Sequence, residues 1–448
     1  MVLSSQFLPR IGRFFLLPLL LLVACGKQQT LQGLFQKQTP HQAYARLLRQ
    51  AGLDRRPAGR AWLDAAEQAL RDSLVVILPL AETGYFRPER PTASSYRYAV
   101  RAGEQIHVSL TLAPGSAARV FIDAFEVVQA QAPRPLASAD TLQLEFRYHA
   151  KEDGQHLLRV QPELLAAGRY TLRLRREPSL SVFPVLGRSD AAVGSFWGAE
   201  RDRGARRHEG IDIFAPRGTP VVAAAGGYIT RTGITPLGGR VVWLADTEHG
   251  AHLYYAHLDR QLVQPGQRVQ PGDTLGLVGS TGNAQGTQPH LHFGIYRAGQ
   301  GAVDPFPAVR RPDVRPDVPQ GTDQRGEYVR LRSAGALGRR PGDKPAARAA
   351  QLSKQLPLLV LGRQGTALRV ETPDGRTGYV SVAAVLPAGS QPLQRLALKT
   401  PVELLARPLA AAAALAALPG RTPVAVLGQD REFSLLRGPG GEVGWAVI

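Results

Sequence analysis

Histidines gather in one quarter of this sequence. Six of the ten histidines lie between Phe196 and Pro305, namely His208, His249, His252, His257, His290 and His292. An imidazole is the commonest protein ligand for transition metals and the usual proton carrier near neutral pH. The stretch from 196 to 305 therefore predicts a metal centre, an acid–base site, or both together.

The spacing of two pairs fits metal ligands. His290 and His292 are two residues apart, and residues two apart in a strand face the same side. His208 and Asp212 are four apart, but the Glu-Gly pair between them favours a loop that leads into a strand rather than a helix. Two imidazoles and a carboxylate make a suitable zinc set that leaves the fourth tetrahedral position for water. Either pair alone is more often a coincidence than a ligand pair.

Further motifs surround these residues. They are Ser195-Phe-Trp-Gly198, His208-Glu-Gly-Ile-Asp-Ile-Phe-Ala-Pro-Arg-Gly-Thr-Pro-Val221, Tyr255-Ala-His257, Val263-Gln-Pro-Gly266, Gly279-Ser-Thr-Gly282 and Pro289-His-Leu-His-Phe293. As a set they resemble the lysostaphin/LytM-type zinc endopeptidases across residues 196–305, while the rest of the chain is only loosely covered. The resemblance implies that His208, Asp212 and His292 bind one zinc ion, and that His257 and His290 are catalytic histidines that do not bind the metal.

This division of roles is chemically consistent. Zinc lowers the pKa of its bound water to about 7 and polarises a carbonyl group. A neutral imidazole can take the proton of that water, and the same or a second imidazole can stabilise the oxyanion and protonate the leaving amine. Which of His257 and His290 has which part stays open.

Other polar residues in the stretch are expected to have no catalytic role. His249 and His252 are expected to be bystanders, because strand alternation places His252 and His257 on opposite faces. Glu209 is expected on the surface. The segment from Gly279 to Asn283 lacks the Lys-Ser/Thr ending of a P-loop, so it is expected to be a turn that shapes the groove beside His290 and His292.

The whole chain predicts a mainly β, multidomain protein, because 448 residues exceed one compact core. Period-two alternation dominates from about residue 74 to 176, and helical spacing precedes it. The expected segments are a signal peptide (1–24), a tether with a short helical hairpin (25–73), an antiparallel β-sandwich (74–178), a LytM-type β peptidase domain (190–308), a Pro-rich linker (309–326) and two small SH3-like barrels (327–388 and 393–448).

The two C-terminal segments are an internal repeat. Val360-Leu-Gly362, Pro373-Asp-Gly375 and Gly378-Tyr-Val380 recur 66 residues later as Val426-Leu-Gly428, Pro439-Gly-Gly441 and Gly444-Trp-Ala446. A duplicated unit with short strands and glycine turns is typical of small barrels. Its ends resemble bacterial SH3-like domains, which implies binding to cell-wall peptides. A role as a spacer is equally compatible with the repeat.

The only cysteine closes a short apolar stretch near the N-terminus. Leu22-Val-Ala-Cys25 follows a basic and then an apolar segment and resembles the bacterial lipobox, in which the cysteine is lipidated. The alternative is an ordinary signal peptide. Gly26 follows the cysteine instead of an aspartate, which favours the outer membrane, facing the periplasm, in a Gram-negative cell. A lipidated Cys25 leaves the mature chain without a thiol for a disulfide or a nucleophile.

The formal net charge of +18 favours acidic partners. No nucleic-acid-binding motif accompanies the arginines, so nucleic acid is not expected as a partner. The resemblance and the expected envelope location together predict a zinc endopeptidase that cuts peptidoglycan cross-links. The alternatives are a non-enzymatic wall-binding activator or scaffold and a protease of secreted proteins. The five filled site positions favour an enzyme.

Overall fold

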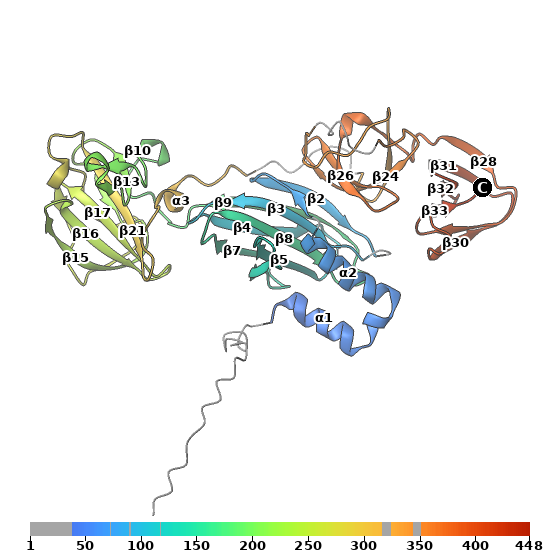
Figure 1. Ribbon diagram of the computed structural model, residues 1–448, viewed down its shortest axis with the longest axis horizontal. Coiled ribbons are helices and arrows are strands. Elements are labelled where there is room, and N and C mark those ends of the chain that lie inside the picture. The colour runs from blue at the N-terminus through green and yellow to red at the C-terminus, as the bar shows by residue number, and fades with distance from the viewer. Residues whose placement is uncertain (1–37, 72, 89–90, 117, 316–323, 344–350) are drawn as a thin grey trace, which may run out of the picture. The chain divides into compact units, whose positions relative to one another are not determined.

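The computed structural model describes residues 38–448 except 72, 89–90, 117, 316–323 and 344–350 (Figure 1). Cys25, the expected signal peptide and most of the expected tether lie outside the described residues, so the lipid anchor stays a prediction. Among the described residues, no helix has the length and apolar character needed to cross a membrane.

Two helices begin the described chain where the sequence predicts a helical hairpin. They are α1 (Pro40–Gln50) and α2 (Pro57–Arg71), joined by a short 3-10 turn. Each buries residues three or four positions apart, which form one buried face. Trp62 of α2 is 1% exposed, packs against Phe121 and donates its indole N–H to the carbonyl of Pro162 at 2.8 Å. The hairpin is therefore fixed to the sandwich that follows it.

Two sheets pack face to face between residues 74 and 177. The first sheet has the order β1-β3-β8-β5-β6, formed by β1 (Leu74–Val75), β3 (Ser94–Val100), β8 (Gly154–Pro162), β5 (Val120–Glu126) and β6 (Arg134–Ser138). The second contains β2 (Leu80–Phe86), β9 (Gly168–Glu177), β4 (Gln105–Leu112) and β7 (Glu145–His149), in that order. Alternate residues of both sheets share one core. The sandwich is not purely antiparallel, because the two-residue strand β1 pairs with β3 in parallel.

The second sheet of the sandwich continues into the first C-terminal repeat. Strand β2 pairs with β24 (Pro357–Gln364). This pairing joins β24, β25 (Ala367–Glu371) and β26 (Thr377–Ser381) to the sandwich strands β2, β9, β4 and β7 in one sheet. Glu82 of β2 is fully buried there and accepts hydrogen bonds from Arg369 at 2.7 Å and from Tyr96 at 2.8 Å. The sequence shows no sign of this junction.

The two repeats have matching strands. The first contains β23 (Tyr328–Leu331), β24, β25 (Ala367–Glu371), β26 (Thr377–Ser381) and β27 (Val385–Pro387). The second contains β28 (Gln394–Ala397), β29 (Val402–Leu405), β30 (Ala414–Leu418), β31 (Pro423–Asp430), β32 (Phe433–Arg437) and β33 (Val443–Ala446). Strands β23, β24, β25 and β26 begin 66 residues before β28, β31, β32 and β33. Among the described residues no strand pairing closes either sheet into a barrel, so the SH3-like barrels stay a prediction.

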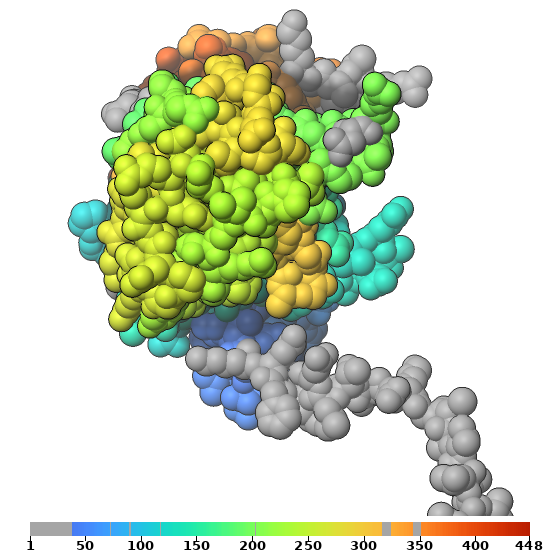
Figure 2. Space-filling model, turned by 90° about the vertical axis from the view of Figure 1, so that its left-hand side faces the viewer, coloured from blue at the N-terminus to red at the C-terminus, as the bar shows by residue number. Residues whose placement is uncertain are grey.

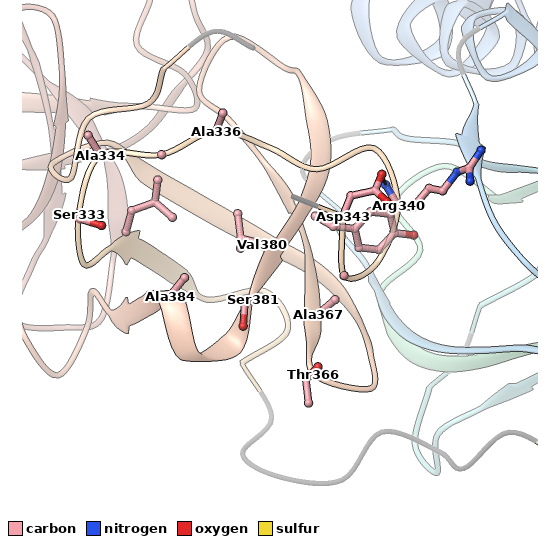
Figure 3. Close-up of a pocket in the computed structure, with 14 residues that line it drawn as sticks. Ser333, Ala334, Ala336, Arg340, Asp343, Thr366, Ala367, Val380, Ser381 and Ala384 are labelled. Atoms are coloured by element: carbon pink, nitrogen blue, oxygen red, sulfur yellow. Dashed lines mark hydrogen bonds between the residues drawn. The ribbon is translucent and has the colours of Figure 1, made fainter. Parts of the chain in front are cut away.

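The first repeat contains a small hollow of about 370 Å³ beside β26 (Figure 3). Its labelled side chains are mostly alanines and serines, and Arg340 and Asp343 lie together at one end. The backbone N–H of Arg340 donates to the Asp343 carboxylate at 2.9 Å, so these two residues form a local turn. The lining contains no histidine or cysteine that could bind a metal.

The histidine-rich stretch forms a large sheet, whose main strands are labelled in Figure 1, and a small sheet that shares a core with one of its faces. The large sheet has the order β10 (Val193–Ser195), β13 (Ile211–Phe214), β21 (His290–Arg297), β17 (Ala251–Leu258), β16 (Gly239–Asp246), β15 (Gly227–Thr235) and β19 (Arg268–Val269), with β22 (Gly301–Val303) also on β21. The small sheet consists of β14 (Pro220–Val222), β20 (Thr274–Leu277) and β18 (Arg260–Gln261). The core between them includes Val221, Leu253 and Phe293. The opposite face of the large sheet carries the candidate site.

Candidate active site

A row of paired residues crosses four strands of the large sheet. Ser195, Asp212, His292 and Ala256 are successive partners on β10, β13, β21 and β17. Directly paired residues on neighbouring strands place their side chains on one face, with Cβ atoms about 5 Å apart. The register therefore brings a carboxylate and an imidazole together, and Asp212 Oδ1 lies 3.1 Å from His292 Nδ1.

His208 reaches the same point from a loop. Its backbone N–H donates to the carbonyl of Ala199 at 2.8 Å, and its carbonyl accepts from the N–H of Gly198 at 2.9 Å. Its Nε2 atom lies 3.0 Å from Asp212 Oδ1 and 3.0 Å from His292 Nδ1. Tetrahedral ligands with bonds of about 2.0–2.1 Å are about 3.3 Å apart, so these separations suit one small ion.

The protons on these groups also fit a cation. His208 Nδ1 is 2.9 Å from the carbonyl oxygen of Phe196, and only an N–H can serve that acceptor. A neutral His208 then has a lone pair on Nε2, directed at a carboxylate oxygen that also carries lone pairs. A cation among the three atoms would accept the lone pairs of all three. The donor set fits zinc, which takes imidazole nitrogen and carboxylate oxygen.

Gly210 makes room for this arrangement. A Cβ atom at position 210 would lie 2.7 Å from the imidazole of His292 and 2.6 Å from the carbonyl oxygen of Phe293. The glycine between His208 and Asp212 therefore lets the loop pass directly behind the His292 ring. Any side chain at this position would displace the His292 ring or the backbone of Phe293.

Asp212 is held in its ionised form. Burial by itself raises the pKa of this carboxyl, but contacts with His208 and His292 outweigh it and keep the pKa well below its usual range. Its second oxygen, Oδ2, accepts from the Arg201 guanidinium at 2.8 Å. The same Arg201 nitrogen donates to Ser195 Oγ at 2.6 Å. One carboxylate oxygen thus faces the two imidazoles, and the other is fixed by an arginine.

His257 reaches the cleft through a break in strand alternation. Its φ is +62°, and the pairing register between β16 and β17 shifts beside it. Regular alternation would place His257 in the core with Leu253 and Tyr255, which are both fully buried there. The bulge returns the His257 side chain to the face of Tyr254 and Ala256, where it lines the cleft. The expectation that His252 and His257 face opposite sides is therefore wrong.

His257 and His290 present the same ring nitrogen to the cleft. His257 Nδ1 donates to the carbonyl of Thr281 at 2.8 Å, and His290 Nδ1 donates to the carbonyl of Gln288 at 2.8 Å. The Nε2 atoms of both rings are therefore left for the cleft. The ring centroid of His257 lies 5.0 Å from that of His290 and 5.8 Å from that of His292. Burial, followed by the nearby imidazoles, lowers the pKa of His257 to about 4, so its ring is neutral near pH 7.

These residues line a cleft of about 780 Å³. Figure 2 shows the surface of the domain that contains the cleft, residues 193–303, in green to yellow. Tyr254 and Tyr296 line the cleft, whereas Tyr255, between them in the chain, is in the core. Trp243 is a lining residue that the sequence analysis did not single out. Its ring centroid lies 4.4 Å from Tyr254 and 5.0 Å from Tyr296.

The remaining polar residues lie apart from the three converging ligand atoms. His249 Nδ1 donates to Asp246 at 2.7 Å, and His252 is exposed; neither lines the cleft. Glu209 is exposed but stands at the cleft edge, where it accepts from the Tyr296 hydroxyl at 3.4 Å. The segment from Gly279 to Asn283 begins with a β-bridge from Gly279 to His290 and ends in a 3-10 helix that starts at Gly282. It supplies the Thr281 carbonyl that orients His257.

The model of peptidase family M23 matches residues 206–305. Residues 206–305 form an M23 domain. The L-Ala–D-Glu endopeptidase of Bacillus subtilis (strain 168) is 38% identical over 139 residues, which are 29% of this chain and 42% of that protein. The peptidoglycan DD-endopeptidase ShyC of Vibrio cholerae is 38% identical over 88 residues, 20% of each chain. The catalytic domain of lysostaphin from Staphylococcus simulans is 32% identical, with 25% of this chain and 88% of that chain covered and a TM-score of 0.23.

The chain thus spans less than half the length of these two curated relatives. All five residues predicted from the sequence lie within the M23 domain, and the structure places them on one cleft. Arg201 and Ser195 precede the matched range, and sequence reasoning gave neither a role at the metal site. No spacing rule could have found Arg201, because its contact with Asp212 depends on how the hairpin of β11 (Glu200–Arg201) and β12 (Arg206–Arg207) folds back.

Proposed function

We propose that this protein is a zinc-dependent endopeptidase that hydrolyses peptide cross-links of peptidoglycan. The observation that carries the proposal is the convergence of His208 Nε2, Asp212 Oδ1 and His292 Nδ1 within 4.8 Å of one another. Two further imidazoles, of His257 and His290, line the same cleft and are not needed as ligands. A purely structural metal site would have no use for them.

The geometry of the residues supports a separate role for each of them. His208, Asp212 and His292 would hold the zinc ion, which would supply a Lewis acid and an acidic water. His257 and His290 each keep a lone pair on Nε2, because Nδ1–H is committed to a backbone carbonyl. Either ring can therefore accept a proton at Nε2 and pass it to the leaving amine. The carbonyl partners prevent the rings from turning away, so no reorientation is needed during the reaction.

The relatives favour peptidoglycan as the substrate. Two of them are named for hydrolysis of peptidoglycan or of an L-Ala–D-Glu bond. We also propose that the two C-terminal repeats are SH3-like modules that bind the cell wall, and that a lipid on Cys25 anchors the chain in the outer membrane, facing the periplasm. These proposals rest on the repeat pattern and on the lipobox-like sequence. Anchoring and wall binding would keep the cleft near its substrate.

A digestion with matched variants tests the function. The zinc-loaded protein is incubated with purified muropeptide dimers, and mass spectrometry identifies the new products. Wild type should contain about one zinc and release monomers. His292→Ala should lose zinc, whereas His257→Ala and His290→Ala should keep most of it and lose turnover. Exposed His252 provides a matched control, and His252→Ala should keep both zinc and turnover.

If wild type bound peptidoglycan but released no new amines, the chain would be a wall-binding protein instead. Cleavage of unfolded proteins but not of muropeptides would indicate a protease of secreted proteins.

A further inference from the structure

A row of three paired residues crosses the sheet of the second repeat. Arg395 on β28, Ala425 on β31 and Arg437 on β32 are successive cross-strand partners. Directly paired residues place their side chains on one face of a sheet. Neighbouring strands are about 4.8 Å apart, so the two arginines begin about 10 Å apart, with only a methyl group between them. A group that lies over Ala425 can therefore be contacted from both sides.

The row lines a groove of about 490 Å³. Both arginines are lining residues, and proline, leucine, valine, alanine and glycine make up the rest of the described lining. Arg395 is exposed and Arg437 is half-buried. A Cβ atom on Gly389 would lie 2.6 Å from Arg437 Nη1. The chain at Gly389 therefore passes directly against this guanidinium and restricts where it can point.

The groove carries two positive charges. Among the residues that the structure describes, no aspartate or glutamate lines the groove, and neither guanidinium has an ion-pair or hydrogen-bond partner. Glu442 follows β32, but its carboxylate accepts from the backbone N–H of Gly440 at 3.0 Å. Each guanidinium has five N–H donors. The groove therefore offers two sets of donors and two charges to an anionic ligand.

The first repeat folds in a similar way without these arginines. Arg437 on β32 corresponds to Glu371 on β25, 66 residues earlier, and the strands pair in the same register at this position. Arg395 corresponds in the same way to Val329, which is fully buried. Strand pairing in the repeat therefore does not require an arginine at either position. The two arginines distinguish the second repeat and point to a role other than folding.

We propose that the groove of Arg395 and Arg437 binds a free carboxylate of the peptides in peptidoglycan. A guanidinium binds a carboxylate through paired, charge-assisted hydrogen bonds, and the small side chain of Ala425 leaves room for the ligand between the two arginines. The inference rests on the proposed wall binding of the repeats and names the chemical group that is recognised. It assigns this recognition to the second repeat, because the first has a glutamate in place of Arg437.

The test measures binding of the full chain to purified peptidoglycan by co-sedimentation, with a zinc chelator present so that hydrolysis does not change the polymer. In a second sample of the polymer, carbodiimide and ammonia convert the carboxylates to carboxamides. Wild type should bind the untreated polymer about tenfold more tightly, the effect of about one charge-assisted hydrogen bond. In Arg395→Gln/Arg437→Gln the ratio of the two affinities should fall toward one, while hydrogen exchange of β31 and β32 stays unchanged as a check of folding.

Arg407 and Arg421 provide a matched control, because both are exposed in the same repeat and neither lines the groove. Arg407→Gln/Arg421→Gln removes the same two charges and should keep the wild-type ratio. A charge reversal gives a graded check. Arg437→Glu, which introduces the charge found in the first repeat, should bind the untreated polymer more weakly than Arg437→Gln.

Several outcomes would overturn the inference. Equal binding of wild type to the two polymers would show that carboxylates are not recognised, and so would a double variant that keeps the preference. An equal loss in the control variant would show long-range attraction instead of a binding site. Binding to phosphatidylglycerol vesicles that needs Arg395 and Arg437, without such a need on peptidoglycan, would assign the groove to lipid phosphates. If wild type bound neither polymer, the proposed wall binding itself would fail, whereas the muropeptide digestion tests the hydrolytic function separately.

Discussion

The backbone of His257 gives the sharpest test of how the fold and the site are linked. With φ at +62°, this residue is in the left-handed region, where a Cβ atom costs about 1–2 kcal/mol. Such strain tends to be kept only where function needs it. Here it directs the imidazole out of the core and into the cleft. Replacement of His257 by glycine should therefore relieve strain that replacement by alanine retains.

The magnitude follows from two opposing contributions. Both variants lose the same imidazole contacts, including the bond to the Thr281 carbonyl. Glycine avoids the left-handed cost of about 1–2 kcal/mol, but it loses about 0.4–1 kcal/mol through the greater freedom of the unfolded chain. The free energy of unfolding of His257→Gly should thus exceed that of His257→Ala by about 1 kcal/mol. Neither variant should turn over substrate.

The adjacent residue is the control. Ala256 is fully buried in the same strand and does not have a positive φ. Ala256→Gly should lower the free energy of unfolding by about 1–2 kcal/mol, from added chain freedom and one lost methyl group. Amide hydrogen exchange of peptides from β21, read by mass spectrometry, measures the stability of this domain without interference from the others. If glycine were no better than alanine at position 257, the bulge would not be strained and the reasoning would be refuted.

Three further predictions concern buried polar side chains that stabilise the fold. Burial lowers the pKa of His41 to about 4, so the folded protein holds this ring neutral and its contribution to stability is complete above pH 6.5. As the pH falls from 6.5 toward 4, the free energy of unfolding from urea melts should drop by roughly 3 kcal/mol. His41→Gln should not show this drop. Tyr255→Phe should lower the free energy of unfolding by about 1–3 kcal/mol, because the buried N–H of Ala224 loses its acceptor at 3.0 Å. Glu82→Gln should lower the free energy of unfolding by about 3–5 kcal/mol in denaturant titrations, because the buried Arg369 loses its carboxylate partner. A second change, Arg369→Met, should recover part of this loss.

Local spacing predicted the part of the site that lies along single strands. His290 and His292 are on one face of β21 because the period of a strand is two, and this holds in any sheet. The pairing of His292 with Asp212 depends on the register between β21 and β13, which no local pattern encodes. The resemblance to a family supplied that contact, and the structure brings the same residues together.

Features that depend on irregular backbone or distant contacts were not predictable. The bulge at His257 reverses the side that alternation assigns to it, and nothing in the residues around it marks the reversal. The junction between β2 and β24 joins segments almost three hundred residues apart in the sequence, through Glu82 and Arg369. Arg201 reaches Asp212 only because its hairpin folds back over the cleft. In each case the deciding contact lies outside any window that propensity or periodicity can cover.

Glycines near the cleft allow close contacts between loops that are far apart in the sequence. A Cβ atom on Gly239 would lie 2.2 Å from Thr281 Oγ1, and one on Gly282 would lie 2.2 Å from the backbone nitrogen of Gly239. The two loops can therefore touch only because both positions lack a side chain. Their approach sets the Thr281 carbonyl against His257 Nδ1, while the backbone N–H of His257 donates to the carbonyl of Gly238 at 2.7 Å. Residues that the sequence indicates only as turns thus fix the tautomer and the direction of the His257 ring. A side chain at position 282 should therefore impair turnover without contacting any proposed zinc ligand.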